Sequence, residues 1–193
     1  MYFFSSATVL VIKLFFGFFL FTLIVRFLMQ LVRADYTSPI AHFIVKITDP
    51  VLRPFRRVIP GIMGIDLASV VVILLVQLVE LILINLLPGR QLPGISVLLL
   101  LTVGEVIASF ITIYFICIFA SVLASWIAQG SYNPVLYLIH QIIEPLMGRI
   151  RRLIPPMSGL DISPLIAIAI LIFAYFLIAA QILYIADPMH SYQ

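Results

Sequence analysis

Four long apolar stretches constrain this chain more than any other feature. They cover residues 7–32, 67–87, 95–128 and 164–185, and each contains few charged residues. A helix needs about 20 largely apolar residues to cross the roughly 30 Å hydrocarbon core of a bilayer. Of the 193 residues, 64% are hydrophobic and 10% are charged, whereas about 25% of the residues of a soluble domain are charged. The sequence therefore predicts an all-α membrane protein with four transmembrane helices.

The positions of the basic residues predict the orientation of these helices. Eight of the eleven lysines and arginines lie in two segments, one between the first and second spans and one between the third and fourth spans. Short cytoplasmic loops carry an excess of Lys and Arg. We therefore expect both basic loops in the cytoplasm and both termini outside.

One stretch of the chain occurs twice. The segment DPVLRPFRRVIPGIMGID, which starts at Asp49, returns 95 residues later as EPLMGRIRRLIPPMSGLD, which starts at Glu144. Seven of the eighteen aligned positions are identical, which indicates an internal duplication. Each copy contains a span, a basic loop and a second span, so each copy ends on the side where it began. The sequence predicts two parallel two-helix repeats, residues 1–93 and 94–193, related by an axis along the membrane normal.

A short amphipathic helix is expected in each basic loop. Apolar residues recur there at helical spacing, at Ile40, Phe43, Ile44 and Ile47 in the first copy and at Val135, Ile139 and Ile142 in the second. Such helices would lie in the cytoplasmic membrane surface with their apolar sides toward the acyl chains. Asp49-Pro50 and Glu144-Pro145 are expected to break them, because proline disfavours helical geometry in the residue before it.

The duplicated residues suggest two roles. The residues expected to shape the backbone are Pro60, Gly64 and Asp66, with Pro155, Gly159 and Asp161 as their equivalents. In each copy the proline is expected to end the helix, the glycine to allow a tight bend, and the aspartate to cap the next span. The residues expected to bind anionic lipid headgroups are Arg56, Arg57, Arg151 and Arg152. The alternative for these arginines is a docking or ligand-binding surface made jointly by both copies.

Three charged residues fall within the predicted spans. Helix geometry puts Lys13, Glu80 and Glu105 in one layer, roughly 10–15 Å below the outer surface. Charges inside a bilayer are costly and often functional. We expect a Lys13–Glu80 ion pair that fixes helix register; a proton or cation pathway and snorkelling to the outer surface are the alternatives. Arg26, near the inner boundary, is expected to snorkel.

The sequence gives no support for catalysis or for a bound cofactor. It contains no metal-ligand motif, no phosphate loop and no C-x-x-C-H for covalent haem. His42 and His140 do not occupy equivalent repeat positions, and Cys117 fits simple packing. The basic loops, which have few aromatic neighbours, do not favour nucleic-acid binding.

The two motifs RRVIP…GIDLAS and RRLIPPMSGLDISP, each leading into an apolar span, resemble the signature of the YggT family. That family includes bacterial YlmG proteins and plastid factors related to cytochrome b6 maturation. The resemblance covers essentially the whole chain, and Pro54 in the first copy is its main departure. It implies a bacterial inner-membrane protein without an agreed enzymatic activity, with proposed roles in membrane-protein or haem-protein assembly, envelope organisation and ion uptake under osmotic stress.

These observations predict a non-enzymatic assembly or envelope-organising factor whose partners are anionic lipids and other membrane proteins. The rival hypothesis is a small ion or solute transporter or a channel component. Because four spans form a thin wall, a pore would require a homo-oligomer.

Overall fold

The computed structural model describes residues 2–36, 38–61, 64–89, 91–127, 133–154 and 161–186. These residues form six helices, namely α1 (Tyr2–Leu31), α2 (Pro39–Val58), α3 (Leu67–Asn85), α4 (Ile95–Ile127), α5 (Pro134–Leu153) and α6 (Ser163–Ala186). Four segments are long and apolar enough to cross a membrane: Ser6–Leu31, Leu67–Asn85, Ile95–Trp126 and Ser163–Ile185. The chain is thus all-helical with four candidate spans, close to the ranges expected from hydropathy.

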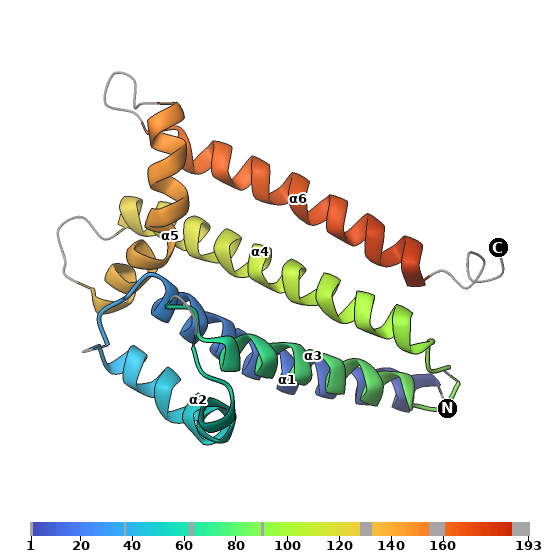
Figure 1. The fold of residues 1–193 in the computed structure, drawn as a ribbon. Coiled ribbons are helices and arrows are strands. Elements are labelled where there is room, and N and C mark those ends of the chain that lie inside the picture. Colours follow the sequence, from blue (N-terminus) through green and yellow to red (C-terminus); the bar gives the residue numbers. More distant parts are fainter. Residues whose placement is uncertain are drawn as a thin grey trace.

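The long helices run side by side, and α2 and α5 cross one end of them (Figure 1). Helix α1 packs against α3, α3 against α4, and α4 against α6. The start of α1, the end of α6 and the connection between α3 and α4 all lie at the opposite end of the bundle (Figure 1). Helices α2 and α5 therefore lie at the same end of the bundle (Figure 1).

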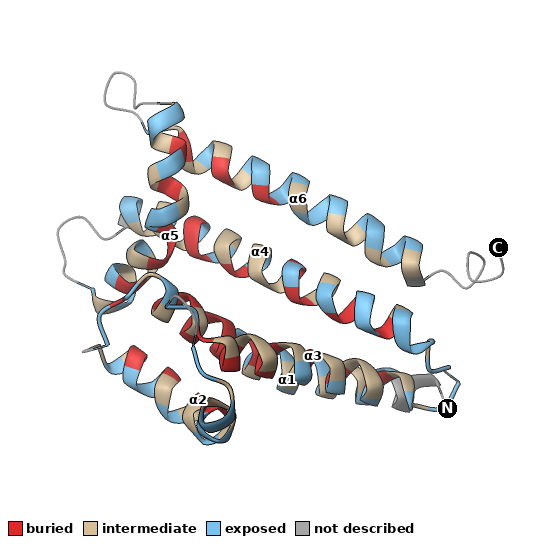
Figure 2. Ribbon diagram, in the orientation of Figure 1, coloured by how far each residue is buried: buried red, intermediate tan, exposed pale blue. Residues whose placement is uncertain are grey.

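The core lies toward the end where α2 and α5 cross. Leu23, Ile24, Leu28 and Met29 of α1 are almost fully buried, and they belong to one apolar cluster with residues of the other five helices. Figure 2 shows the contrast with α6, whose surface is mostly exposed or half-buried. Exposed apolar side chains on a candidate span are what a hydrocarbon environment requires.

Both amphipathic helices begin at a proline that follows a capping residue. Ser38 Oγ accepts a hydrogen bond from the Ala41 N–H at 3.1 Å, and Asn133 Oδ1 accepts one from the Val135 N–H at 2.9 Å. Proline suits the first helical position because its missing N–H has no helical partner there. The two helices have the same length, 20 residues, and their first residues are 95 apart in the sequence.

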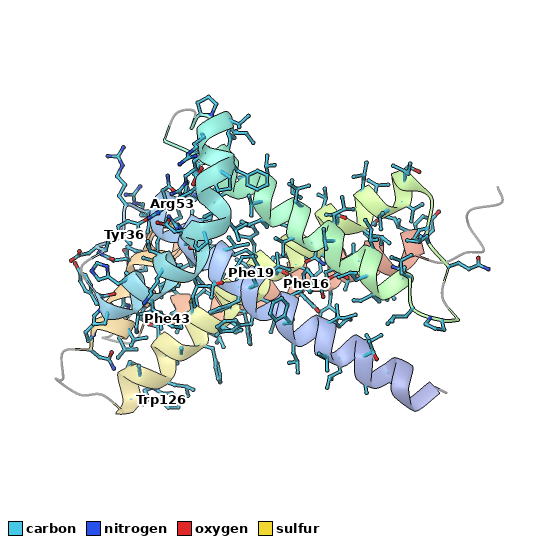
Figure 3. The ribbon with its side chains drawn as sticks, turned by 90° about the horizontal axis from the view of Figure 1, so that it is seen from below. Phe16, Phe19, Tyr36, Phe43, Arg53 and Trp126 are labelled. Atoms are coloured by element: carbon cyan, nitrogen blue, oxygen red, sulfur yellow. The ribbon has the colours of Figure 1, made fainter. Side chains whose placement is uncertain are left out.

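The expectation that these helices break before Pro50 and Pro145 is wrong. Helix α2 continues through Pro50 and Pro54, and α5 continues through Pro145. A proline removes one helical hydrogen bond and forces a local kink, and Figure 3 shows α2 bending along its length. Packing beyond the proline keeps the helix intact, because Leu52 of α2 is fully buried.

The apolar sides of these helices also face the protein more than was expected. Ile44 and Leu52 of α2, and Ile142 and Met147 of α5, are buried in the common core. Only part of each apolar surface points outward. Phe43, labelled in Figure 3, is 56% exposed.

Candidate functional site

Each motif ends in an arginine–aspartate pair that joins an amphipathic helix to the next span. In the first copy, Arg56 Nε donates to Asp66 Oδ2 at 2.9 Å, and Arg56 Nη2 donates to Gln30 Oε1 of α1 at 3.2 Å. Asp66 is also the N-cap of α3, since its Oδ1 accepts from the Ser69 N–H and its Oδ2 from the Ser69 hydroxyl. One side chain, Arg56, therefore ties together α1, α2 and the start of α3.

The second copy has the same pair in a more exposed setting. Arg151 Nε donates to Asp161 Oδ2 at 3.0 Å, and Arg151 Nη1 donates to Glu144 Oε2 at 3.2 Å. Asp161 Oδ1 accepts from the Ser163 N–H at the start of α6 at 2.9 Å. The Asp161 side chain is 35% exposed, against 5% for Asp66. The same contact is thus buried in one repeat and half-exposed in the other.

Hydrogen bonding at these two arginine–aspartate pairs stabilises the charged form of each carboxylate. Burial by itself raises the pKa of Asp66, but hydrogen bonds from Ser69 and Arg56 outweigh it and hold the pKa below its ordinary value. Hydrogen bonds from Ser163 and Arg151 lower the pKa of Asp161. Both carboxylates are therefore ionised at neutral pH.

The second arginine of each motif is placed differently from the first. Arg57 and Arg152 are exposed, whereas Arg56 and Arg151 are half-buried. The next residue in each copy, Val58 or Leu153, is 81% exposed. Each amphipathic helix thus ends in an outward-facing arginine followed by an outward-facing aliphatic side chain.

The other motif-shaping residues are described only in the first copy. Gly64 has a φ of 84°, a left-handed conformation that glycine adopts without a Cβ clash. Pro60 lies two residues after Val58, the last residue of α2, and directly after the C-cap Ile59. Pro155 and Gly159 lie outside the described residues.

Arg26 does not snorkel as expected, and sequence reasoning missed its role. It is 5% exposed, and its Nη1 donates to the Val45 carbonyl at 3.1 Å and to Thr48 Oγ1 at 2.6 Å. Its Nη2 forms an ion pair with Asp49 Oδ1 at 2.5 Å. The buried guanidinium replaces its lost hydration with acceptors on α2, and so anchors α2 to α1. The acidic residue before Pro50 was the available signal, because a buried arginine needs a carboxylate.

Asp49 also binds a second, exposed arginine, Arg53, one helical turn later. In Figure 3, Arg53 lies at the end of the molecule where α2 crosses the bundle. Burial raises the pKa of Asp49, but the hydrogen bond and charge of Arg26 outweigh this and lower it overall. The second repeat has Ser121 at the position equivalent to Arg26 and Gly148 at that of Arg53. This network belongs to the first repeat only.

The three charged residues Lys13, Glu80 and Glu105 of the candidate spans line one cavity of about 340 Å³, formed mainly by α1, α3 and α4. Glu80 is 7% exposed and accepts a hydrogen bond from Gln77 Nε2 at 3.2 Å. Among the described residues no ion pair joins Lys13 to Glu80. The direct pair expected from the sequence is replaced by a shared cavity, with Lys13 on its exposed side and Glu80 on its buried side.

Equivalent positions of the two repeats meet in this cavity. Lys13 corresponds to Ala108, Gly17 to Thr112 and Glu80 to Tyr175, each pair 95 residues apart, and all six residues line it. The cavity is therefore lined by equivalent residues of both copies, and at the Lys13/Ala108 and Glu80/Tyr175 positions only one of the two residues is charged.

Metal binding has no visible basis in the part of the chain that the structure describes. No group of three or more His, Cys, Asp or Glu side chains there is arranged to hold a metal ion. Cys117 is buried in the core.

Comparison with known proteins finds one matching family model and several bacterial relatives. A model of the CCB3/YggT family matches the chain twice, at residues 5–87 and 100–182. An uncharacterised protein of Pseudomonas aeruginosa is 42% identical over 164 residues, covering 84% of this chain and 83% of the relative. The Escherichia coli protein YggT, described as uncharacterised, is 35% identical over 153 residues, covering 77% of each chain. No solved structure matches. The chain belongs to the CCB3/YggT family.

Proposed function

We propose that this chain is a non-enzymatic membrane-assembly or envelope-organising factor of the bacterial inner membrane. In this proposal residues 1–93 and 94–193 are parallel repeats, with α2 and α5 in the cytoplasmic surface and both termini outside. Support comes from the double family match at residues 5–87 and 100–182, and from the position of α2 and α5 at one end of the bundle. The excess of basic residues in these segments favours the cytoplasmic side.

One observation carries the proposed activity: both amphipathic helices end in an exposed arginine and an exposed aliphatic residue. Arg57-Val58 and Arg152-Leu153 are at equivalent positions and are not needed for the Arg56–Asp66 or Arg151–Asp161 pairs. An arginine near an anionic leaflet contributes about 1 kcal/mol of attraction, and an adjacent aliphatic side chain can enter the interface. We propose that these two points bind anionic headgroups and hold a partner membrane protein between them.

The test uses photo-crosslinking in living cells. A photoreactive residue placed at Val58 or at Leu153 should capture the same membrane protein. Capture should be lost when Arg57 and Arg152 are both changed to Gln, and retained when both are changed to Lys. Phe15 is 71% exposed on α1, and a photoreactive residue there serves as the control that should not give this product.

Two outcomes would contradict the proposal. Different proteins at the two positions would show that the repeats do not share a partner. An unchanged crosslink in the double Gln variant would show that the arginine charges are irrelevant. The orientation is tested separately with single cysteines at Val58 and Gln91 in a Cys117→Ala background, because an impermeant thiol reagent applied outside should label only Gln91→Cys.

The cavity favours a second candidate function, the movement of an ion or small solute. Two carboxylates and an ammonium group line a cavity between the repeats at membrane depth, and transporters commonly bind substrates near the bilayer midplane between repeats. A homodimer would be needed to enclose a complete path. Reconstituted vesicles test this function: flux should fall strongly in Glu105→Gln and remain in Arg57→Gln, and an absence of flux with the native protein rejects it.

A further inference from the structure

The polar cavity adjoins an apolar groove. This groove, of about 550 Å³, lies between α4 and α6 and is lined by apolar and aromatic side chains with one threonine. Thr112 and Tyr175 line both the groove and the cavity that holds Lys13, Glu80 and Glu105. Binding sites for small molecules have volumes of about 300–1,000 Å³ and combine apolar walls with a few polar groups. The two spaces together have this character.

The cavity contains unequal numbers of acidic and basic side chains. Glu80 and Glu105 supply two carboxyl groups and Lys13 one amino group, so acidic groups outnumber basic ones in the cavity. Water is scarce at this depth, and a charge there is stabilised chiefly by an opposite charge nearby. Lys13 lies at the exposed side and makes no ion pair with a described carboxylate. Glu80, buried beside Gln77, lines the cavity together with Glu105, so a cationic ligand in the cavity would meet both side chains.

The side chains that line the cavity and the groove favour an organic cation over a hydrated metal ion. Tyr175 and Phe21 border the charged cavity, and Phe115 and Phe176 line the groove. Aromatic faces attract organic cations through their quadrupoles, and the groove offers apolar surface to a hydrophobic body. A small hydrated metal ion would gain nothing from the groove. Glu80 and Tyr175 occupy equivalent positions in the two copies, and they supply a carboxylate and an aromatic ring to the same cavity. This difference between the copies supports a specialised ligand site.

We propose that the cavity and groove together bind a lipophilic organic cation, with the positive centre at Glu80 and Glu105 and the apolar body between α4 and α6. The site is the same as that of the second candidate function and names its ligand class, but binding does not require transport. Binding without flux would reject transport and leave this inference standing. Flux of an inorganic ion without binding of the organic cation would do the reverse.

The experiment measures equilibrium binding of radiolabelled tetraphenylphosphonium to the purified full-length protein in detergent. Removing one charge from a poorly solvated site should change affinity by about tenfold, with a sign set by the charge removed. Glu80→Gln should weaken binding about tenfold, while Lys13→Gln should strengthen it several-fold. Arg53→Gln, at an exposed arginine of α2 that does not line the cavity, should bind like the native protein. Uncharged triphenylphosphine oxide should not compete.

The opposite signs keep the proposal separate from loss of fold, because general destabilisation would weaken binding in both cavity variants. Equal weakening in Glu80→Gln and Lys13→Gln, or no measurable binding by the native protein, would overturn it. Competition by the uncharged analogue would show that the groove alone binds, and would also overturn it. Tighter binding of tetraphenylphosphonium in Glu80→Gln would show that the Glu80 side chain does not attract the cation, and would reject the assigned class.

Discussion

The two arginine–aspartate pairs, Arg56–Asp66 and Arg151–Asp161, give a prediction in which one pair serves as the control for the other. Asp66→Asn and Asp161→Asn each remove one carboxylate charge but leave a side chain that can still cap the following helix, since Asn and Asp cap about equally well. The two pairs have the same sequence spacing, and they differ in burial: the Asp66 side chain is 5% exposed and that of Asp161 is 35% exposed. Any difference in cost therefore reports the environment of the pair.

The structure sets the expected magnitudes. Removing one partner of a fully buried ion pair costs about 3–5 kcal/mol. Arg56 is 33% exposed and keeps its hydrogen bond to Gln30, so we expect about 2–3 kcal/mol for Asp66→Asn after discounting for solvent. Exposed ion pairs contribute about 0–1 kcal/mol, which is the loss expected for Asp161→Asn. The predicted difference is about 2 kcal/mol.

Stability is measured by reversible unfolding with SDS in mixed micelles, followed by far-ultraviolet circular dichroism. The pH dependence supplies a second readout. Because the folded pKa of Asp66 is below its ordinary value of 3.8, its contribution is complete above that value and is lost as the pH falls through the lower folded pKa. The native protein should therefore lose stability below about pH 4 more steeply than Asp66→Asn. Equal costs for the two substitutions, or identical acid profiles, would refute the reasoning.

Three further predictions concern single positions. Arg26→Met should destabilise the protein by about 2–4 kcal/mol, because it removes a buried guanidinium that binds Asp49; Arg53→Ala, at an exposed partner of the same carboxylate, should cost less than about 1 kcal/mol in the same unfolding assay. Gly64→Ala should cost about 1 kcal/mol or more, since a φ of 84° strains any residue with a Cβ, and a normal midpoint would contradict the turn geometry. Gly104→Leu should separate α4 from α6 and lower the thermal midpoint, because even a Cβ there would lie 2.9 Å from Ile182 Cγ1; Gly94→Leu, where a Cβ meets open space, is the control.

Local rules accounted for much of the fold. Hydropathy and length located the four candidate spans, because the thickness of a bilayer fixes the number of residues in a spanning helix. The 95-residue spacing of the two motifs matched the spacing of the two family matches and of α2 and α5. The placement of Asp66 before an apolar run identified the start of α3, because capping depends on residues only three apart.

Proline positions show where local rules failed. The sequence before Pro50 and Pro145 favours a helix end, yet the helices continue because residues beyond the proline pack into the core. A local preference of a few kcal/mol yields to burial of apolar side chains whose partners lie far away in the sequence. No reading of the neighbouring residues alone reveals those partners.

The sequence by itself predicted that the three charges lie in one layer, and only the tertiary structure decided which way each side chain faces. Helix rise per residue is fixed, so residue counting along the spans is enough to assign Lys13, Glu80 and Glu105 to one layer. Rotation of each helix about its axis is set by packing, which brought these residues to one cavity without the expected ion pair. The same packing buried Arg26 against α2 and left Arg57 and Arg152 facing outward. The position of a residue along its helix follows from the fixed rise per residue. The direction of its side chain follows from contacts between segments that are distant in the sequence.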